Sequence, residues 1–106
     1  MILYWDFLIP KKYDAITIGP QIVMRKASKG DIGLLEHEKV HVKQFWKFLL
    51  LHPILYYFSK KYRCNAEVEA FKKQLEYSPN SKDLYAYYLS TNYGLDITVE
   101  EAKLLL

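Results

Sequence analysis

The chain has 106 residues, 51% of them apolar and 25% charged, a balance that excludes a disordered chain and is typical of one globular domain. The net charge of +3 is small and does not require a nucleic-acid partner. A single cysteine, Cys64, excludes an internal disulfide. Because no apolar run reaches the roughly 20 residues of a membrane-spanning helix, we expect a soluble, cytoplasmic protein with one domain, residues 1–106.

The first 25 residues are rich in strand-forming side chains. Residues 2–9 are mostly apolar or aromatic, and residues 15–18 and 21–25 lie on either side of Gly19 and Pro20, a pair typical of turns. We therefore expect a small antiparallel β layer at this end of the chain.

The remaining residues show the spacing of helices. Helical segments are predicted for residues 32–51, about 53–77 with a break near 62, 82–90 and 99–106. The first segment has an apolar stripe that predicts its buried face, formed by Leu35, Val42, Trp46 and Leu49. A β layer followed by helices makes the expected fold α+β.

Candidate N-cap residues precede these helices. Ser28 or Asp31 stands before the first helix, Ser81 before the third and Thr98 before the last. Glu101 follows Thr98 by three residues, which is the spacing of a capping box and predicts a short final helix.

The segment LLEHEKVHVKQ contains the spacing H-E-x-x-H at His37, Glu38 and His41. Residues four apart lie on one face of a helix, so both imidazoles can reach one metal ion, and neutral imidazole suits Zn²⁺. Glu38 is rotated by about 100° from His37, where its carboxylate can act as a general base on a water at the ion. Chance alone predicts roughly 0.005 such matches in a chain of this composition.

A catalytic zinc site needs a third protein ligand and one open position. His52 is the only other histidine. It does not fit the motif H-E-x-x-H-x-x-G-x-x-H, whose third histidine would be residue 47, and residue 47 is a lysine. A glutamate of the segment RCNAEVEAFKKQLE is the better candidate. Glu67 and Glu69 are two residues apart and point to different sides of a helix, so only one of them can be the ligand.

These two segments resemble the gluzincin metallopeptidases, which carry H-E-x-x-H on one helix and a glutamate ligand on a following helix. The short length and the segment NAEVEAF are most similar to the minigluzincins, small domains similar to the catalytic cores of integral-membrane zinc peptidases. The resemblance extends over about residues 16–71, and the two motifs are its specific part.

The resemblance implies a zinc-dependent metallopeptidase that binds one Zn²⁺ per chain and hydrolyses peptide or protein substrates. It implies His37, His41 and Glu67 as metal ligands and Glu38 as the general base, with Glu67 preferred over Glu69.

The chain departs from the family pattern at one position. Where many relatives have an aspartate that orients a ligand histidine, this chain has Phe71. Asn65, Tyr62 or a backbone carbonyl is therefore expected to take that role.

The resemblance also assigns roles to two other segments. Residues 21–25 would form an edge strand that binds an extended substrate, although an ordinary sheet strand fits the pattern equally well. Residues 94–106 would block the cleft of a latent zymogen, within one molecule or between two, whereas a helix that completes the core explains the same residues without the family. The tyrosine-rich helices and the apolar tail also allow a homodimer.

Other interpretations stay open. A zinc-binding interaction module that cleaves nothing would use similar residues, but structural zinc sites are normally closed by four protein ligands. Cys64 fits a buried structural thiol better than an inhibitory ligand. The residue that stabilises the oxyanion is expected among four tyrosines, which suit packing equally well: Tyr85, Tyr87, Tyr88 and Tyr93.

Overall fold

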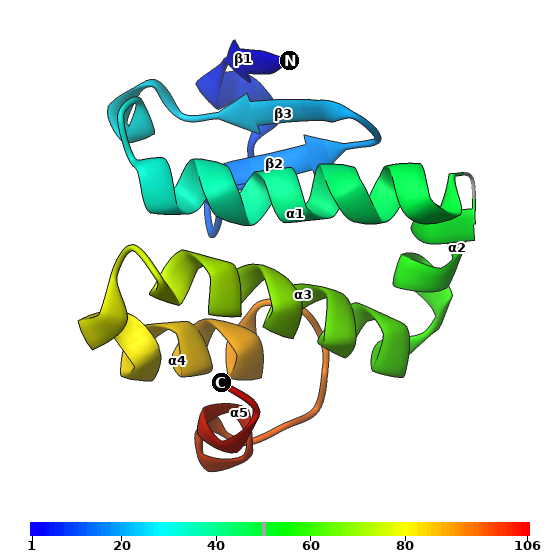
Figure 1. The fold of residues 1–106 in the computed structure, drawn as a ribbon, viewed down its shortest axis with the longest axis vertical. Coiled ribbons are helices and arrows are strands. Elements are labelled where there is room, and N and C mark those ends of the chain that lie inside the picture. Colours follow the sequence, from blue (N-terminus) through cyan, green and yellow to red (C-terminus); the bar gives the residue numbers. More distant parts are fainter. Residues whose placement is uncertain (50) are drawn as a thin grey trace.

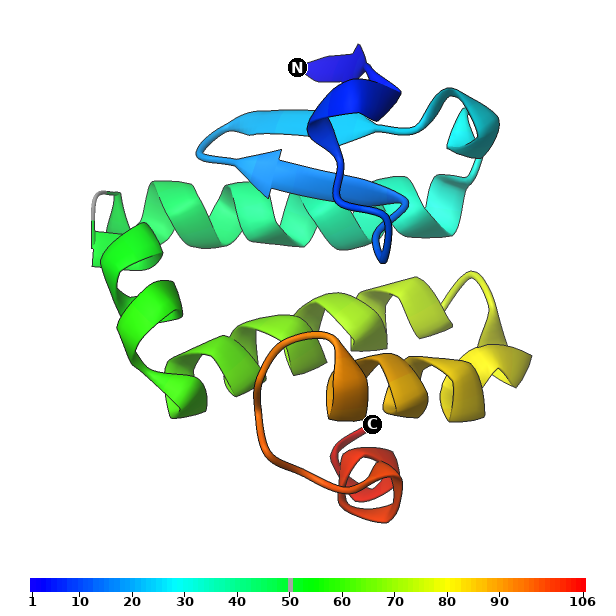
Figure 2. The same ribbon diagram turned by 180° about the vertical axis from the view of Figure 1, so that it is seen from behind.

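The computed structural model describes residues 1–49 and 51–106, and it has the α+β fold that the sequence predicts. A three-stranded sheet lies on one side of the long helix α1, and the other helices lie beyond α1 (Figures 1 and 2). The strands are β1 (Ile2–Tyr4), β2 (Ala15–Ile18) and β3 (Gln21–Met24). The helices are α1 (Ile32–Phe48), α2 (Leu51–Phe58), α3 (Lys60–Leu75), α4 (Lys82–Thr91) and α5 (Val99–Leu105). Short 3₁₀ turns are formed by Asp6–Leu8, Lys26–Ser28 and Pro79–Ser81.

The sheet is mixed, with the strand order β1-β3-β2. β2 and β3 form the expected antiparallel hairpin, whose turn uses Gly19 at a φ of +58° that favours glycine. β1 instead runs parallel to β3, with Ile2 opposite Ile22, because the chain crosses the sheet between β1 and β2. The expectation of a wholly antiparallel layer is therefore wrong in this detail.

The order of the strands also corrects the expected edge strand. Residues 21–24 form the central strand, hydrogen-bonded to a neighbour on each side, so their backbone has no edge to offer a substrate. Among the described residues β2 pairs with β3 alone, so Ala15–Ile18 is the strand with an open edge.

Capping residues set the boundaries of the helices. The Asp31 carboxylate accepts from the Leu34 backbone N–H at 3.0 Å and begins α1. Ser59 separates α2 from α3 and accepts from the Tyr62 N–H at 3.1 Å, three residues before the predicted break. Thr98 forms the predicted capping box at α5. No helix within residues 1–49 and 51–106 combines the length and apolar character that crossing a membrane requires.

Two hydrophobic clusters lie on opposite sides of α1. Between the sheet and α1 the buried members are Ala15, Ile22 and Met24, and between α3, α4 and α5 they are Phe71, Tyr85, Ala86, Leu89, Leu95 and Ala102. The layer between the clusters, where α1 meets α3, is polar. Its buried side chains are His37, Glu38, His41, Gln44, Glu67 and Gln74.

This polar layer changes the predicted orientation of α1. Leu35 and Val42 pack against the sheet cluster as expected. Trp46 and Leu49, however, are 59% and 53% exposed, because the face that α1 turns toward α3 carries the polar side chains instead. Burying polar groups costs free energy unless they are paired, so this layer is a poor way to build a core and a good indication of a site.

Candidate metal centre

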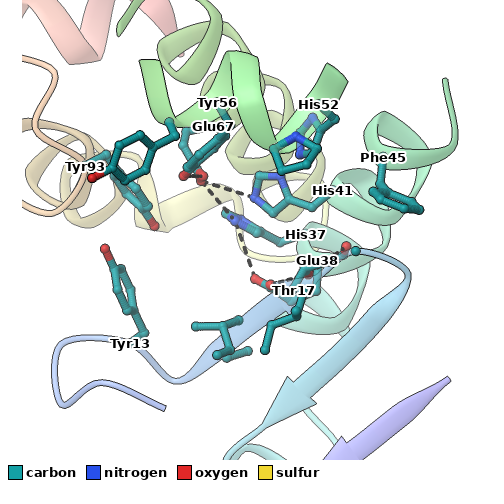
Figure 3. Close-up of a pocket in the computed structure, with 16 residues that line it drawn as sticks. Tyr13, Thr17, His37, Glu38, His41, Phe45, His52, Tyr56, Glu67 and Tyr93 are labelled. Atoms are coloured by element: carbon teal, nitrogen blue, oxygen red, sulfur yellow. Dashed lines mark hydrogen bonds and ion pairs between the residues drawn. The ribbon is translucent and has the colours of Figure 1, made fainter. Parts of the chain in front are cut away.

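Three buried side chains converge between α1 and α3 (Figure 3). The Nε2 atoms of His37 and His41 lie 3.5 and 3.3 Å from Oε1 of Glu67, and the potential ligand atoms of the three residues all lie within 4.8 Å of one another. The histidines come from successive turns of α1, as their spacing predicts, and Glu67 faces them from α3. Glu69 is two residues further on and is exposed on another side of α3.

One carboxylate oxygen of Glu67 lies in the middle of this cluster, near Nε2 of both histidines. Oε1 is buried and accepts no hydrogen bond from any described residue, whereas Oε2 accepts from the Tyr56 hydroxyl. A buried carboxylate oxygen without a donor is costly unless a cation or another donor occupies its lone pair. Two imidazole nitrogens and one carboxylate oxygen are a donor set that zinc accepts, so the cluster could hold a metal ion.

In the absence of metal these side chains form a charged pair. Burial lowers the pKa of His41, but the Glu67 carboxylate raises it further, and the resulting pKa is about 10. Burial likewise raises the pKa of Glu67, but His41 and His37 hold it well below its usual range. At neutral pH a proton on His41 therefore occupies the region in which a metal ion would bind.

Glu38 lies at the side of the cluster and faces the sheet. Its Oε1 accepts from the Thr17 hydroxyl of β2 at 2.7 Å, and its Oε2 lies 3.6 Å from Nε2 of His37 (Figure 3). The hydrogen bond fixes the carboxylate rotamer and leaves one oxygen directed toward the cluster. Thr17 was not among the sequence candidates, because only the fold brings β2 against the middle of α1.

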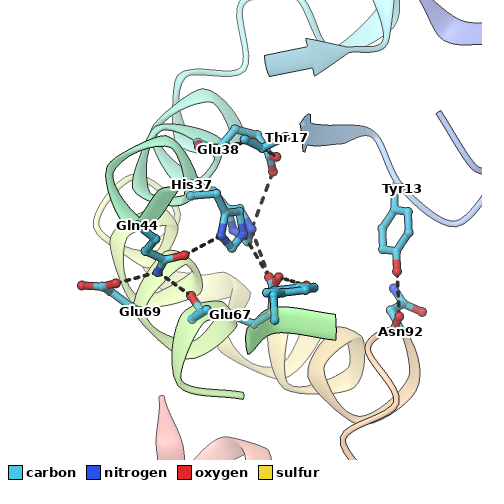
Figure 4. A network of polar contacts seen from close by, with 11 residues as sticks. Tyr13, Thr17, His37, Glu38, Gln44, Glu67, Glu69 and Asn92 are labelled. Carbon is cyan, nitrogen blue, oxygen red and sulfur yellow. Dashed lines mark hydrogen bonds and ion pairs between the residues drawn. The ribbon is translucent and has the colours of Figure 1, made fainter. Parts of the chain in front are cut away.

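His41 is oriented by a side chain of its own helix. Its Nδ1 donates to Oε1 of Gln44 at 2.9 Å, which leaves Nε2 toward Glu67. Gln44 in turn donates through Nε2 to the Ala66 carbonyl at 3.1 Å and to the Glu69 carboxylate at 2.6 Å (Figure 4). Gln44 therefore orients His41, a role in orienting a ligand histidine that was expected of Asn65, Tyr62 or a backbone carbonyl. Its position three residues after His41 was the available sequence signal.

His37 has no equivalent support among the described residues. Its Nδ1 is buried without a hydrogen-bond partner, and the ring of Phe71 packs against it with centroids 4.5 Å apart. At the position where the resemblance led us to expect an aspartate, the Phe71 ring therefore holds His37 by an aromatic contact and not by a hydrogen bond.

The cluster forms the floor of a cleft of about 430 Å³. Its walls come from β2, from Phe45 of α1, from Pro53, Tyr56 and Tyr57 of α2, and from Tyr93 after α4. At one side the Tyr13 hydroxyl donates to the Asn92 carbonyl at 2.7 Å and joins the sheet half to the helical half.

The other sequence candidates lie in different places. Of the four tyrosines proposed near the oxyanion, Tyr93 lines this cleft, whereas Tyr85 belongs to the helical core and Tyr87 is exposed. Cys64 packs at the edge of the same core. His52 lines the cleft and its Nδ1 contacts the Tyr62 hydroxyl at 2.7 Å, outside the three-residue cluster.

The C-terminal segment packs against the helices. Leu95 and Ala102 are buried in the helical core, and α5 lies beside α4 on the side away from the sheet (Figures 1 and 2). The last residue that lines the cleft is Tyr93. The predicted role of residues 94–106 in latency stays a prediction.

Comparisons with family models, with curated proteins and with solved structures find no match to this chain. The cleft and its side chains therefore carry the inference of function.

Proposed function

We propose that this chain is a zinc-dependent metallopeptidase of gluzincin type that hydrolyses peptide bonds in the cleft between β2 and α2. The observation that carries the proposal is the convergence of His37, His41 and Glu67 in that cleft, with Glu38 beside them. The motif resemblance points to the same residues.

The metal would be held by Nε2 of each histidine and by Oε1 of Glu67. Zinc supplies, when bound, a Lewis acid for the peptide carbonyl and a lowered pKa for water. Three ligands among the described residues leave one position of a tetrahedral site open. A catalytic zinc site needs such an open position, whereas a structural zinc site is closed by four protein ligands. This count favours the peptidase over the interaction module.

Glu38 would move the proton. One carboxylate oxygen is directed toward the cluster, where it accepts the proton of the attacking water and then donates it to the leaving amine. The hydrogen bond from Thr17 holds the other oxygen, so the carboxylate does not rotate away between these two steps.

The substrate would bind as an added strand on β2. The open edge of β2 forms one wall of the cleft, and an extended peptide can pair with its backbone. Gly19, which follows β2, lies against the Phe45 ring in the wall of this cleft. The largely apolar and aromatic walls favour substrates with large apolar side chains near the cleaved bond.

Zinc content and cleavage of a peptide library together test this proposal. We expect one zinc per chain in the wild type and loss of the metal in His41→Ala and Glu67→Ala. Glu76→Gln, the matched control at an exposed glutamate that pairs with Lys73 outside the cluster, should keep zinc and activity. Glu38→Gln should keep zinc but reduce cleavage by roughly 100- to 10,000-fold, because it removes the base and not a ligand. Undiminished cleavage by Glu38→Gln would contradict the assignment.

A further inference from the structure

One end of the molecule exposes large apolar side chains next to lysines. This α2 end consists of the last turns of α1, of α2 and of the start of α3, which lie together at one side of the fold (Figures 1 and 2). Tyr57 and Phe58 are 76% and 78% exposed, which means that they project from the surface. The other exposed apolar members are Trp46, Phe48, Leu49, Leu51, Ile54 and Leu55, and the exposed lysines are Lys43, Lys47, Lys60 and Lys61.

Positive charge is concentrated in the stretch of chain that includes this end, where Lys39 and Lys60 have acidic partners, Glu36 and Asp96. The 28 residues 39–66 contain six Lys or Arg and no Asp or Glu, whereas the other 78 residues contain nine Lys or Arg and twelve Asp or Glu. The small net charge of +3 therefore combines a segment of +6 with a remainder of −3. Such asymmetry indicates an anionic partner for the α2 end.

The exposed side chains show which anionic partner fits. Aromatic and aliphatic groups bordered by lysines are the composition of a surface that lies in the headgroup region of a bilayer. α2 itself has no Asp, Glu, Lys or Arg, so its projecting side chains can enter an apolar layer without burying a charge. The bases of a nucleic acid can stack on the aromatic side chains, but a nucleic acid would leave the aliphatic Leu51 and Ile54 without a partner.

A second copy of the chain fits this end less well than a lipid surface. In a symmetric dimer the same patch meets itself, so the lysines of one α2 end would face those of the other. Like charges placed opposite one another at an interface are unfavourable.

We propose that the α2 end docks on the surface of anionic lipid bilayers, with Trp46, Ile54 and Phe58 in the headgroup region and the lysines on acidic headgroups. The contact lies on the membrane and does not span it, because α2 has eight residues. Pro53, Tyr56 and Tyr57 belong to α2 and also line the cleft, so docking would place the mouth of the cleft near the lipid surface. The inference does not depend on metal binding or on catalysis.

Vesicle flotation of the full chain tests the proposal, with vesicles of phosphatidylcholine alone or mixed with phosphatidylglycerol. We expect binding to the mixed vesicles that weakens as salt is added. Ile54→Ser combined with Phe58→Ser should lower the affinity by about tenfold or more, because both side chains insert. Lys47→Glu combined with Lys61→Glu should also lower the affinity, because the introduced carboxylates are repelled by the acidic headgroups.

Matched controls use exposed residues elsewhere. Leu104→Ser removes an 88% exposed apolar side chain of α5, and Lys11→Glu combined with Lys82→Glu makes the same change in net charge away from the α2 end. Both should bind like the wild type. Circular dichroism establishes that each variant is folded.

A direct reading comes from tryptophan fluorescence in a Trp5→Phe background, where Trp46 is the sole tryptophan. A blue shift on adding phosphatidylglycerol vesicles is expected if Trp46 enters the headgroup region. The proposal is overturned if the folded wild type does not bind the vesicles, or if the controls lose binding as much as the test variants. Binding of single-stranded DNA, or dimerisation through the α2 end, in place of vesicle binding would overturn it as well.

Discussion

Gln44 and Phe71 support the two histidines of the cluster in different ways. Gln44 accepts from Nδ1 of His41 and is itself held by α3, whereas Phe71 leaves Nδ1 of His37 without a partner. Hydrogen bonds of this kind fix the tautomer and the ring orientation of a ligand. His41 is therefore the better oriented of the two.

The role of Gln44 can be tested by removing its amide. We expect Gln44→Leu to weaken zinc binding by roughly 10- to 100-fold, because His41 loses the acceptor that orients it. Gln74→Leu is the matched control, since Gln74 is also a buried glutamine but its Oε1 has no hydrogen-bond partner among the described residues. Competition with a chromogenic chelator measures both affinities. Equal losses in the two variants would show that Gln44 acts only through packing.

The pair of His41 and Glu67 predicts how the metal-free protein responds to pH. His41 has a raised pKa, so its contribution to stability is complete below its ordinary value of 6.5 and is lost as the pH rises through about 10. Glu67 has a lowered pKa, so its contribution is complete above its ordinary value of 4.5 and is lost in acid. From this pair we expect greatest stability between about pH 4.5 and 6.5.

Urea unfolding in the presence of a chelator, over a range of pH, measures this profile. In Glu67→Gln the carboxylate that raises the pKa of His41 is gone, so the loss of stability toward alkaline pH should flatten. An unchanged alkaline profile in that variant would place the cause in another group.

At the scale of the elements, the N-cap residues of two helices differ in whether their side chains accept a capping hydrogen bond. The Thr98 hydroxyl accepts from the Glu101 N–H at 3.1 Å, whereas the Ser81 side chain makes no capping bond at α4. We expect Thr98→Ala to lower the free energy of unfolding by about 1 kcal/mol and Ser81→Ala to change it much less. Chemical denaturation measures both. A larger effect for Ser81 would contradict this account of the two caps.

The predictability of the elements follows from the range of the interactions that define them. The helices, the capping box at Thr98 and the meeting of His37 with His41 depend on residues a few positions apart, and the sequence was sufficient for them. The parallel pairing of β1 and the open edge of β2 depend on how the chain crosses the sheet, which local patterns do not contain.

The same distinction explains the site. From the sequence, only the family resemblance favoured Glu67 over Glu69 as the third ligand. The packing of α3 on α1 makes the choice independently, because it places Glu67 beside the two histidines. Gln44 shares the helical face of His41 and was within reach of the spacing argument. Thr17 and Tyr56 reach the cluster from other elements, and nothing in their local sequence marks them.

At the scale of the whole molecule, the polar layer divides the fold. The sheet cluster and the helical cluster lie on opposite sides of α1, and the buried polar side chains of α1 and α3 stand where a continuous core would otherwise be. This contact should therefore be the weakest part of the metal-free protein, because paired charges contribute less to stability than packed apolar groups.

A metal ion ligated by His37, His41 and Glu67 would connect α1 to α3 and so join the two halves. At a free zinc concentration 100 times the dissociation constant we expect about 2.7 kcal/mol of added stability by mass action. Hydrogen exchange should slow most in α1 and α3 when zinc replaces the chelator. It should slow less in α4 and α5, which pack on the far side and gain only the added global stability. Glu67→Gln should show neither effect. Uniform slowing across all helices would mean that the metal raises only the global stability and does not suppress local opening at this contact, which would contradict a local cross-link.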